Sequence, residues 1–382
     1  MRHRVRRVHF VGIGGAGMSG LAEILHASGY RVSGSDRADA SSTRRLAARG
    51  IEVGIGHDAA AVEGADVVVF SAAVPATNVE LRAAERARIP VISRAEMLAE
   101  LMRLKHGVAI SGSHGKTTTT SLVGEVLGAG GLDPTTIAGG RVQNLGANSR
   151  LGAGDILVAE ADESDGSFLK LAPTLVVVTN VDREHLDHYR EFDNLLQAFA
   201  DFANRVPFYG AAIACIDDPS VQALLPRLSR RVRTYGLSPQ ADVGAGEVAA
   251  DGLGMRFVAR SGTRELGEVR LSMPGEHNVA NALAALAVGE ELGVPFDRAR
   301  EALERFAGVA RRFELCGERA GVRVVDDYAH HPTEIRATLR AARRAFDGRL
   351  AVVFQPHRYT RTRDLFDELS RAFHEADRVW IT

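Results

Sequence analysis

The stretch VAISGSHGKTTTT at residues 108–120 decides the fold of this chain. Its apolar first part predicts a buried β-strand at residues 108–111, and the glycine loop with the threonine run behind it predicts the start of an α-helix. At such a helix start, free backbone N–H groups can surround phosphate oxygens. Lys116 can then reach the β- and γ-phosphates of a nucleotide, and the Thr117 hydroxyl can bind Mg2+. The loop is shorter than the GxxxxGK[ST] pattern, because Ile110 stands where that pattern has its first glycine.

Lysine is so scarce in this chain that its presence in the loop carries weight. Of 47 basic side chains only three are lysines, and the other two are Lys105 and Lys170. A compact ammonium and a planar guanidinium are not interchangeable at a phosphate site. Lys116 is therefore a candidate phosphate contact, whereas chance survival accounts for the other two lysines. The alternative for the whole loop is an ordinary surface helix start.

Acidic side chains follow the next apolar runs. EADESD at residues 160–165 comes after the run 156–158, and TNVDREHLD at residues 179–187 comes after the run 175–179. Strands of a parallel sheet bring their carboxyl ends to one edge, where a nucleotide binds. Glu160 is therefore a candidate Mg2+ ligand, and His185 is a candidate contact of a second metal or of phosphate. The alternatives are a solvated acidic loop and a structural histidine.

Another glycine loop, GIGGAG at residues 12–17, follows the apolar run 5–11. Its spacing fits GxGxxG, and an aspartate closes the next strand, so the loop can hold a pyrophosphate while the acid accepts a ribose hydroxyl. The candidate residues are Gly12, Gly14, Gly15, Ala16, Gly17, Met18, Ser19 and Asp36. A tight turn without a ligand and an NAD-dependent oxidoreductase are the alternatives. Hydride transfer has no need for a second, triphosphate-type loop, so the pair of loops favours a ligase or a kinase.

Apolar runs alternate with helical stretches along the whole chain, which predicts an α/β protein. A new strand–loop–helix unit begins near residue 106 and another β/α series near residue 312, so we expect domains at residues 1–105, 106–311 and 312–382. The first looks doubly wound. Residues 252–271 predict an antiparallel appendage to the second domain, and residues 280–292 predict a helix. Three apolar runs, 323–326, 350–354 and 378–381, predict the strands of the third domain.

Composition excludes several classes of partner. The formal net charge is −1 and no apolar run approaches eighteen residues, so we expect no nucleic-acid or membrane partner and a cytoplasmic location. The two cysteines, Cys215 and Cys316, form no CxxC pattern and are expected to be buried, inert thiols in a reducing compartment.

Six segments together resemble the Mur ligases of peptidoglycan synthesis, in the order found in that family. They are GSHGKTTT at 112–119, EADESD at 160–165, TNVDREHLDHY at 179–189, GEHNVAN at 275–281, RRFE at 311–314 and DDYAHHP at 326–332. The resemblance implies a three-domain Mur ligase architecture. A Rossmann-like N-terminal domain would bind a UDP-linked substrate, a central P-loop-type domain would bind ATP, and a Rossmann-like C-terminal domain would close over both.

The resemblance also implies roles for single residues. The expected catalytic group is Lys116, Glu160, His185, Arg312 and His330. ATP contacts are implied for Gly112, Ser113, His114, Gly115, Lys116, Thr117 and Thr118 in the loop, for His277, Asn278 and Asn281 near the adenine, for Arg312 near the phosphates and for Asp326 near the ribose. One Mg2+ is implied at Thr117 and Glu160, and another at Glu160 and His185. The carboxylate of an incoming amino acid is assigned to Arg358 and Arg361, with Tyr328 and His330 nearby. Helix-cap asparagines and a solvated basic helix start are the alternatives for the Asn278–Asn281 and Arg358–Arg361 pairs.

Within the family, two segments resemble the member that joins L-alanine to UDP-N-acetylmuramate through an acyl phosphate. They are GIGGAGMSGLA at 12–22 and FQPHRYTRT at 354–362. The nearest rival is a sibling ligase that attaches a recycled peptide to the same sugar acid, and a catalytically silent nucleotide-binding module is a third possibility. As a Mur ligase the chain is expected to be a monomer or a homodimer.

The third domain is short compared with the family pattern. With about seventy residues after Arg312, we expect it to be incomplete, with an open sheet edge and an exposed aromatic side chain. We further expect a loosely held C-terminal segment and weak or absent turnover.

Overall fold

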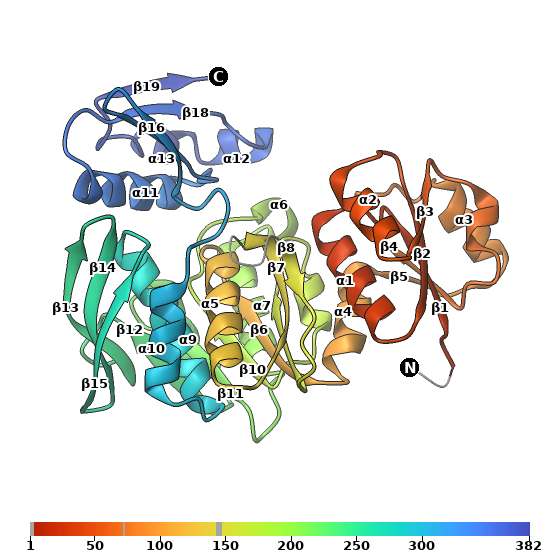
Figure 1. Ribbon diagram of the computed structural model, residues 1–382, viewed down its shortest axis with the longest axis horizontal. Coiled ribbons are helices and arrows are strands. Elements are labelled where there is room, and N and C mark those ends of the chain that lie inside the picture. Colours follow the sequence, from red (N-terminus) through yellow and green to blue (C-terminus); the bar gives the residue numbers. More distant parts are fainter. Residues whose placement is uncertain (1–3, 72, 143–146) are drawn as a thin grey trace.

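The computed structural model describes residues 4–71, 73–142 and 147–382, and its elements fall into three parts along the chain (Figure 1). The first part holds a five-stranded sheet, the second a ten-stranded sheet, and the third two separate pairs of strands. No helix among the described residues is long and apolar enough to cross a membrane.

The first part is a parallel sheet in the order β3-β2-β1-β4-β5. Its strands are β1 (Arg7–Val11), β2 (Arg31–Asp36), β3 (Glu52–Ile55), β4 (Val67–Phe70) and β5 (Val91–Ser93). Its helices are α1 (Ala16–Ala27), α2 (Ser41–Ala48), α3 (Val79–Arg86) and α4 (Arg94–Met102), with a 3-10 turn at Ala59–Val62. Val68 and Val69 are neighbours on β4 but enter two different apolar cores, because helices cover both faces of the sheet. The doubly wound prediction is therefore confirmed.

The second part is built on a mixed sheet in the order β15-β14-β13-β12-β11-β10-β6-β9-β7-β8. Its strands are β6 (His106–Ser111), β7 (Thr135–Val142), β8 (Ala147–Arg150), β9 (Ile156–Glu160), β10 (Leu175–Val178), β11 (Ala211–Cys215), β12 (Val232–Gly236), β13 (Val243–Asp251), β14 (Gly254–Ser261) and β15 (Arg264–Leu271). Its helices are α5 (Lys116–Ala129), α6 (Leu186–Tyr189), α7 (Phe192–Ala203), α8 (Pro219–Leu224), α9 (Glu276–Glu291) and α10 (Phe296–Arg305), with 3-10 turns at Ser167–Lys170 and Leu225–Arg227. The strands β13, β14 and β15 are antiparallel, which confirms the predicted appendage and extends it to residue 243.

The order β10-β6-β9 decides where the functional segments meet. These three strands are parallel neighbours, so the loops that leave their carboxyl ends lie side by side. The loop after β6 holds the phosphate-loop motif, the loop after β9 holds the acidic run, and the loop after β10 holds the segment that ends at His185. The first part packs against β7 and β8, the last two strands in the order of this sheet, which α1 contacts.

In Figure 1 the third part lies on the side of the central sheet where strands β10, β6 and β9 end. Its strand pairing differs from the prediction in one respect. Its strands β18 (Ala351–Phe354) and β19 (Arg378–Ile381) are a parallel pair, but β17 (Val322–Asp326) pairs antiparallel with β16 (Glu314–Arg319) instead of joining them. The cause is the tight turn at Ala320 and Gly321, because a connection this short permits only antiparallel pairing. Its helices are α11 (Pro332–Ala345), α12 (Tyr359–Asp364) and α13 (Phe366–Ser370).

Two further expectations for buried side chains meet different outcomes. Cys215 is buried at the end of β11, and burial raises the pKa of its thiol to about 12, so it is inert as predicted. Cys316 is exposed on β16, so the expectation of two buried thiols was wrong for this residue.

The continuous apolar run of β19 pairs only with β18 among the described strands, and Trp380 is 49% exposed.

Candidate active site

The phosphate loop needs glycine at two positions because the chain has no room for a side chain there. Gly112 and Gly115 have φ values of +128° and +79°. A Cβ on Gly112 would lie 2.0 Å from the Thr179 hydroxyl oxygen, and one on Gly115 would lie 2.8 Å from Oδ1 of Asn281. The segment after β10 holds the loop in place, since Asn180 accepts the backbone N–H of His114 through Oδ1 at 2.8 Å. The loop is thus fixed in shape by a neighbouring strand end.

Lys116 begins α5 and folds back onto its own loop. Its Nζ donates to the carbonyl oxygens of Gly112 (2.5 Å) and Ser113 (3.2 Å) and to both carboxylate oxygens of Glu163, at 3.0 and 2.8 Å. Burial works to lower the pKa of Lys116, but the carboxylates of Glu163, Asp162 and Glu160 outweigh it and raise the pKa above the usual value. Lys116 is therefore a charged ammonium, and its counter-ion is a fully buried carboxylate.

Glu163 was not assigned a role from the sequence. The only signal was its membership of the acidic run at residues 160–165, which does not say which of the four acids turns inward. The structure separates them, because Glu160 pairs with Thr117 and Glu163 pairs with Lys116.

The Thr117 hydroxyl and the Glu160 carboxylate are placed as a pair of hard oxygen donors. The Thr117 hydroxyl donates to both carboxylate oxygens of Glu160, at 3.0 and 3.2 Å, and the Gly139 backbone N–H holds the same carboxylate at 2.6 Å. Oxygen donors at the foot of a phosphate loop are the ligands that Mg2+ takes in proteins. This pair therefore fits the predicted metal position.

His185 lies on the same cavity but has other near neighbours. Its Nε2 is 3.8 Å from a carboxylate oxygen of Glu163 and 3.8 Å from one of Glu184. Burial lowers the pKa of His185 although Glu184 and Asp162 oppose this, so a ring nitrogen is free of a proton and can bind a metal. The closest carboxylates to His185 are thus not Glu160, with which it was expected to share an ion, and Glu163, Glu184 and His185 together have the spacing of a metal site. The shared Glu160–His185 ion stays a prediction.

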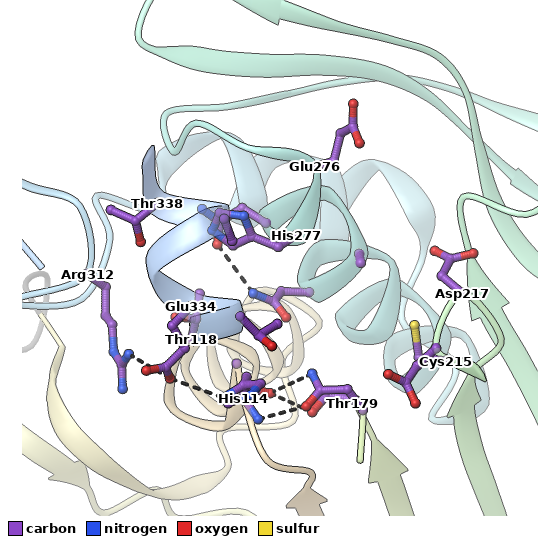
Figure 2. A pocket seen from close by; sticks show the side chains of 18 of the residues that line it. His114, Thr118, Thr179, Cys215, Asp217, Glu276, His277, Arg312, Glu334 and Thr338 are labelled. Carbon is purple, nitrogen blue, oxygen red and sulfur yellow. Dashed lines mark hydrogen bonds and ion pairs between the residues drawn. The ribbon is translucent and has the colours of Figure 1, made fainter. Parts of the chain in front are cut away.

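A cavity of about 380 Å3 lies between the phosphate loop, α9 and α11 (Figure 2). His277, Asn278 and Asn281 line it as expected, and the two asparagines are joined by a hydrogen bond of 3.3 Å. Burial and the nearby Arg312 lower the pKa of His277 to about 4, so its ring is neutral and suited to a flat, uncharged ligand group. The three residues predicted to lie near the adenine therefore line one cavity, and their contact with a nucleotide stays a prediction.

Several residues of this cavity were not predicted. Cys215, Asp217 and Tyr235 come from the ends of β11 and β12, and the signal was the Asp217–Asp218 pair directly after an apolar run. Asp327 lines the cavity, whereas the predicted ribose contact Asp326 does not, because Asp326 turns away to pair with Arg311 at 3.2 Å. The role of Asp326 stays a prediction.

A second cavity of about 260 Å3 joins the phosphate loop to the third part of the chain. It brings together predicted residues from both: Ser113, His114, Gly115, Lys116, Thr117, Glu160, His185, Arg312, Tyr328, His330, Arg358 and Arg361. His114, Gly115, Thr117, Arg312 and Glu334 line both cavities, so the two adjoin at these side chains. A nucleotide in the first cavity would direct its phosphates toward the second.

The two predicted carboxylate-binding arginines are not equivalent. Arg361 pairs with the buried Glu184 through Nε and Nη2, both at 3.2 Å. Arg358 lies at the start of α12 with a φ of +67°, a strained conformation for a residue with a side chain. Among the described residues no ion pair is found for Arg358, so its guanidinium is the one available to an anionic ligand.

The first glycine loop, residues 12–17, is held in shape by Asp36. Oδ2 of Asp36 accepts the backbone N–H of Gly14 at 2.8 Å, and the Ser42 hydroxyl donates to the Gly14 carbonyl. Met18 and Ser19 are 1% exposed and the Met18 side chain packs in the core, and the predicted substrate contacts of these two residues stay a prediction. A Cβ on Gly17 would lie 2.4 Å from a guanidinium nitrogen of Arg94, a residue that the sequence did not point to.

A phosphate loop with a buried lysine, oxygen ligands for a divalent ion and a third segment that adds arginines to the same cavity are the parts of an ATP-dependent ligase. Models of three domains of one family match the chain in this order: "Mur ligase family, catalytic domain" at residues 7–106, "Mur ligase middle domain" at 110–289 and "Mur ligase, glutamate ligase domain" at 311–382. The chain belongs to the Mur ligase family.

Relatives at high identity share one function. The UDP-N-acetylmuramate–L-alanine ligase of Sorangium cellulosum is 59% identical over the whole of this chain and 82% of its own length. That of Anaeromyxobacter dehalogenans is 55% identical over the whole chain and 83% of its own length. Among solved structures, UDP-N-acetylmuramate-alanine ligase from Thermotoga maritima is similar with a TM-score of 0.83 and 30% identity, covering 98% of this chain and 84% of that one. A murein peptide ligase from Psychrobacter arcticus has a TM-score of 0.79 at 27% identity, with the same coverage.

Proposed function

We propose that this chain joins the amino group of L-alanine to the carboxylate of UDP-N-acetylmuramate while ATP is cleaved to ADP and phosphate. The relatives at 55–59% identity are named as UDP-N-acetylmuramate–L-alanine ligases. The observation that carries the proposal is the second cavity, which is lined by the phosphate loop, by acidic side chains and by the C-terminal arginines. It offers one place for a phosphoryl group, a carboxylate and an amino acid to meet.

The chemistry requires activation because a carboxylate is a poor electrophile. In the first step a carboxylate oxygen of the sugar acid attacks the γ-phosphorus, the bond to the β-phosphate oxygen breaks and ADP leaves. The ammonium of Lys116 is the protein's own charge for the oxygens of this transition state, and it would have to exchange Glu163 for phosphate. The backbone N–H groups at the start of α5 add fixed dipoles.

Mg2+ is the proposed cofactor, held by Thr117 and Glu160, and when bound it neutralises charge on the phosphates. Glu160 accepts hydrogen bonds from two donors, the Thr117 hydroxyl and the Gly139 backbone N–H, so its orientation is set before an ion arrives. His185, with its free ring nitrogen, is the proposed contact of a second ion.

In the second step the neutral amine of alanine attacks the carbonyl carbon of the acyl phosphate, and a tetrahedral oxyanion forms. The C–O bond to the phosphate then breaks, phosphate leaves, and the new C–N bond is kept. The amine nitrogen gives up one proton on the way. Arg358 is the proposed anchor for the alanine carboxylate, because its guanidinium lines the cavity and Arg361 is already paired with Glu184. Tyr328 and His330 line the same cavity. Water must be excluded, since it would hydrolyse the acyl phosphate.

The partners in this proposal are small molecules, and the compartment is the cytoplasm. An exposed and unpaired Cys316 fits a reducing environment. We propose that the three functional units correspond to residues 1–105 for the UDP-linked substrate, 106–311 for ATP and 312–382 for the amino acid.

The test is direct. The chain is incubated with ATP, UDP-N-acetylmuramate and either L-alanine or the tripeptide of the sibling ligase, and phosphate release and product mass are followed. We expect phosphate release and a mass gain of one alanyl group only with alanine. Product with the tripeptide alone would assign the sibling activity. Reduction of NAD+ without ATP would instead support the oxidoreductase.

A further inference from the structure

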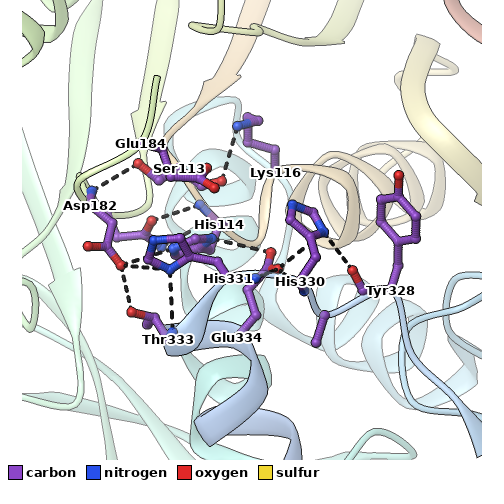
Figure 3. Close-up of polar contacts among 12 residues, drawn as sticks. Ser113, His114, Lys116, Asp182, Glu184, Tyr328, His330, His331, Thr333 and Glu334 are labelled. Atoms are coloured by element: carbon purple, nitrogen blue, oxygen red, sulfur yellow. Dashed lines mark hydrogen bonds and ion pairs between the residues drawn. The ribbon is translucent and has the colours of Figure 1, made fainter. Parts of the chain in front are cut away.

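One side chain of the phosphate loop contacts the third part of the chain directly. His114 lies between two acids that are far apart in the sequence (Figure 3). Its Nε2 is 3.1 Å from a carboxylate oxygen of Asp182, in the segment after β10, and its Nδ1 is 3.2 Å from a carboxylate oxygen of Glu334, in the first turn of α11. No function assigned so far uses this contact.

The arrangement requires a charged ring. A carboxylate only accepts hydrogen bonds, so a histidine between two carboxylates must donate from both nitrogens, and only the imidazolium does so. Burial works to lower the pKa of His114, but hydrogen bonds to Asp182 and Glu334, with the charge of Glu184, outweigh it and raise the pKa to about 9. The ring is 11% exposed, so water screens these contacts little.

The neighbours of the ring belong to the third part of the chain. His331, the N-cap of α11, packs against His114 with ring centroids 4.7 Å apart and the rings tilted by 39°, and the Thr333 hydroxyl donates to the same Asp182 oxygen at 2.6 Å. Arg312 lies 3.8 Å from Glu334 and lines both cavities. The first turn of α11 is therefore seated on the phosphate loop at the point where the two cavities join.

A metal ion is a weaker account of the same cluster. His114, Asp182 and His331 have ligand atoms within 4.8 Å of one another. However, Nδ1 of His331 already accepts the Thr333 backbone N–H at 3.3 Å, and both nitrogens of His114 face acids. Nε2 of His331 is buried without a hydrogen-bond partner among the described residues, but both nitrogens of His114 are already engaged, so the bridge between Asp182 and Glu334 needs no ion.

We propose that His114 is a positioning residue whose imidazolium bridge between Asp182 and Glu334 couples the docking of residues 312–382 to the shape of the phosphate loop. The backbone of His114 precedes Gly115 and Lys116 directly, so a shift of the imidazole moves the residues that bind phosphate. Docking supplies the Glu334 end of the bridge and, with it, brings Arg358 and Tyr328 to the second cavity. The ATP half and the amino-acid half of the site are thereby assembled together. This inference rests on the proposed function for its substrates, but the bridge itself does not.

The test uses a double-mutant cycle of His114→Gln, Glu334→Gln and the two combined. Glutamine at 334 still accepts the backbone N–H groups of His330 and His331, so the cap of α11 is preserved while the charge is lost. His374→Gln is the matched control, because His374 is exposed on the same part of the chain. Circular dichroism shows whether each variant is folded. If His114→Gln does not fold, hydrogen exchange in Glu334→Gln alone tests the bridge.

Two readouts are measured. The first is backbone hydrogen exchange in α11 and in residues 112–119 without substrates, which needs no ligase activity. We expect each single variant to exchange at least tenfold faster in both segments, the double variant to be no faster than the worse single variant, and the control to match the parent chain. The second readout is the KM for ATP and for alanine, both of which should rise at least fivefold.

Exchange that is unchanged in α11 or in the loop would overturn the proposal, as would single effects that multiply in the double variant. If the parent chain shows no ligation of alanine, the proposed function fails and the exchange cycle still decides the bridge. If ligation is present and exchange is unaffected, the bridge fails and the proposed function stands.

Discussion

The glycine loop after β1 and the glycine loop after β6 begin alike, with a parallel strand, a glycine at positive φ and a helix, but different charges surround them. In the first loop an acid, Asp36, takes the Gly14 backbone N–H. In the second loop the same region holds a lysine and three acids, Lys116 with Glu160, Asp162 and Glu163. The first loop can accept a diphosphate through backbone groups alone, whereas the second is a densely charged site that needs both a cation and a phosphate to balance.

The difference teaches that glycine spacing indicates only that a loop can approach phosphate. What kind of phosphate, and with which metal, depends on the side chains that neighbouring strands bring. Those side chains come from residues 160–163 and 179–185, more than forty residues beyond the loop. The following substitutions test this contrast, from the largest expected effect to the smallest.

Lys116→Arg should abolish turnover, with a loss on the order of 100- to 1,000-fold, because a planar guanidinium cannot occupy the pocket made by two carbonyls and Glu163. Phosphate release at saturating substrates measures it. Lys170→Arg is the control, since Lys170 forms an ion pair with Glu96 at the surface and its substitution should change turnover little. Near-normal turnover of Lys116→Arg would remove the lysine from the reaction.

Glu160→Gln should raise the Mg2+ concentration needed for half-maximal activity by roughly 10- to 100-fold, because the amide keeps the contact with Thr117 but loses a charge-assisted interaction. A Mg2+ titration of turnover measures this. Asp165→Asn serves as the control within the same acidic run, where the side chain caps the Ser167 backbone N–H. An unchanged titration in Glu160→Gln would show that the ion binds elsewhere.

Arg358→Ala combined with Arg361→Ala should raise the KM for alanine by about tenfold or more, from the loss of a charge-assisted contact, and leave the KM for ATP within about twofold. Arg363→Ala is matched to them, as it is an exposed arginine of α12 paired with Asp364. Equal increases in the KM for alanine and the KM for ATP would mean that the two arginines do not act on the alanine carboxylate alone.

Asp36→Asn should raise the KM for UDP-N-acetylmuramate by about five- to tenfold with no change for ATP, because an amide can accept only one of the two backbone N–H groups, those of Gly14 and Ala38, that the carboxylate accepts now. Asp39→Asn, which removes a surface ion pair with Arg44, is the control. If the KM for ATP rose instead, the division of labour between the two loops would be reversed.

Alkaline pH should loosen the second loop and leave the first unaffected. The folded-state pKa of His114 is raised to about 9 from an ordinary 6.5, so its contribution is complete below about 6.5 and is lost as the pH rises through 9. Asp182 and Glu334 have lowered pKa values, despite burial, because His114 hydrogen-bonds to them, so their contribution is lost only in acid. Binding of a fluorescent ATP analogue should weaken a few-fold from pH 7 to pH 10, and binding of the UDP-linked substrate should not. Equal weakening of both would exclude His114 as the cause.

The sequence predicted the elements of the site better than the contacts within it. The strand at 378–381 was predicted to the residue, and a helix start was predicted within the loop and threonine run, where α5 begins, because apolar runs and glycine breaks are local signals. That residues 112–117, 160 and 185 meet also followed, since neighbouring parallel strands share an edge.

The remaining contacts depend on side chains that approach from distant parts of the chain. Glu334 is 220 residues from His114, and no local pattern relates them. The choice of Glu163 over its acidic neighbours as the partner of Lys116 depends on which side chain turns inward after β9. The antiparallel pairing of β17 was missed because an apolar run does not reveal its partner strand.

The scarcity of lysine gives the phosphate loop a built-in chemical reporter. An amine-acylating reagent has three side-chain targets in this sequence, apart from the amino terminus. Lys170 is half-exposed, Lys105 donates to the Gly154 carbonyl, and Lys116 is 14% exposed with a raised pKa and four oxygen partners. Because only an uncharged, accessible amine is acylated, Lys170 should be modified first and Lys116 last. The mass of the peptide that contains residue 116 then measures how often the loop releases its lysine, without any substrate being turned over.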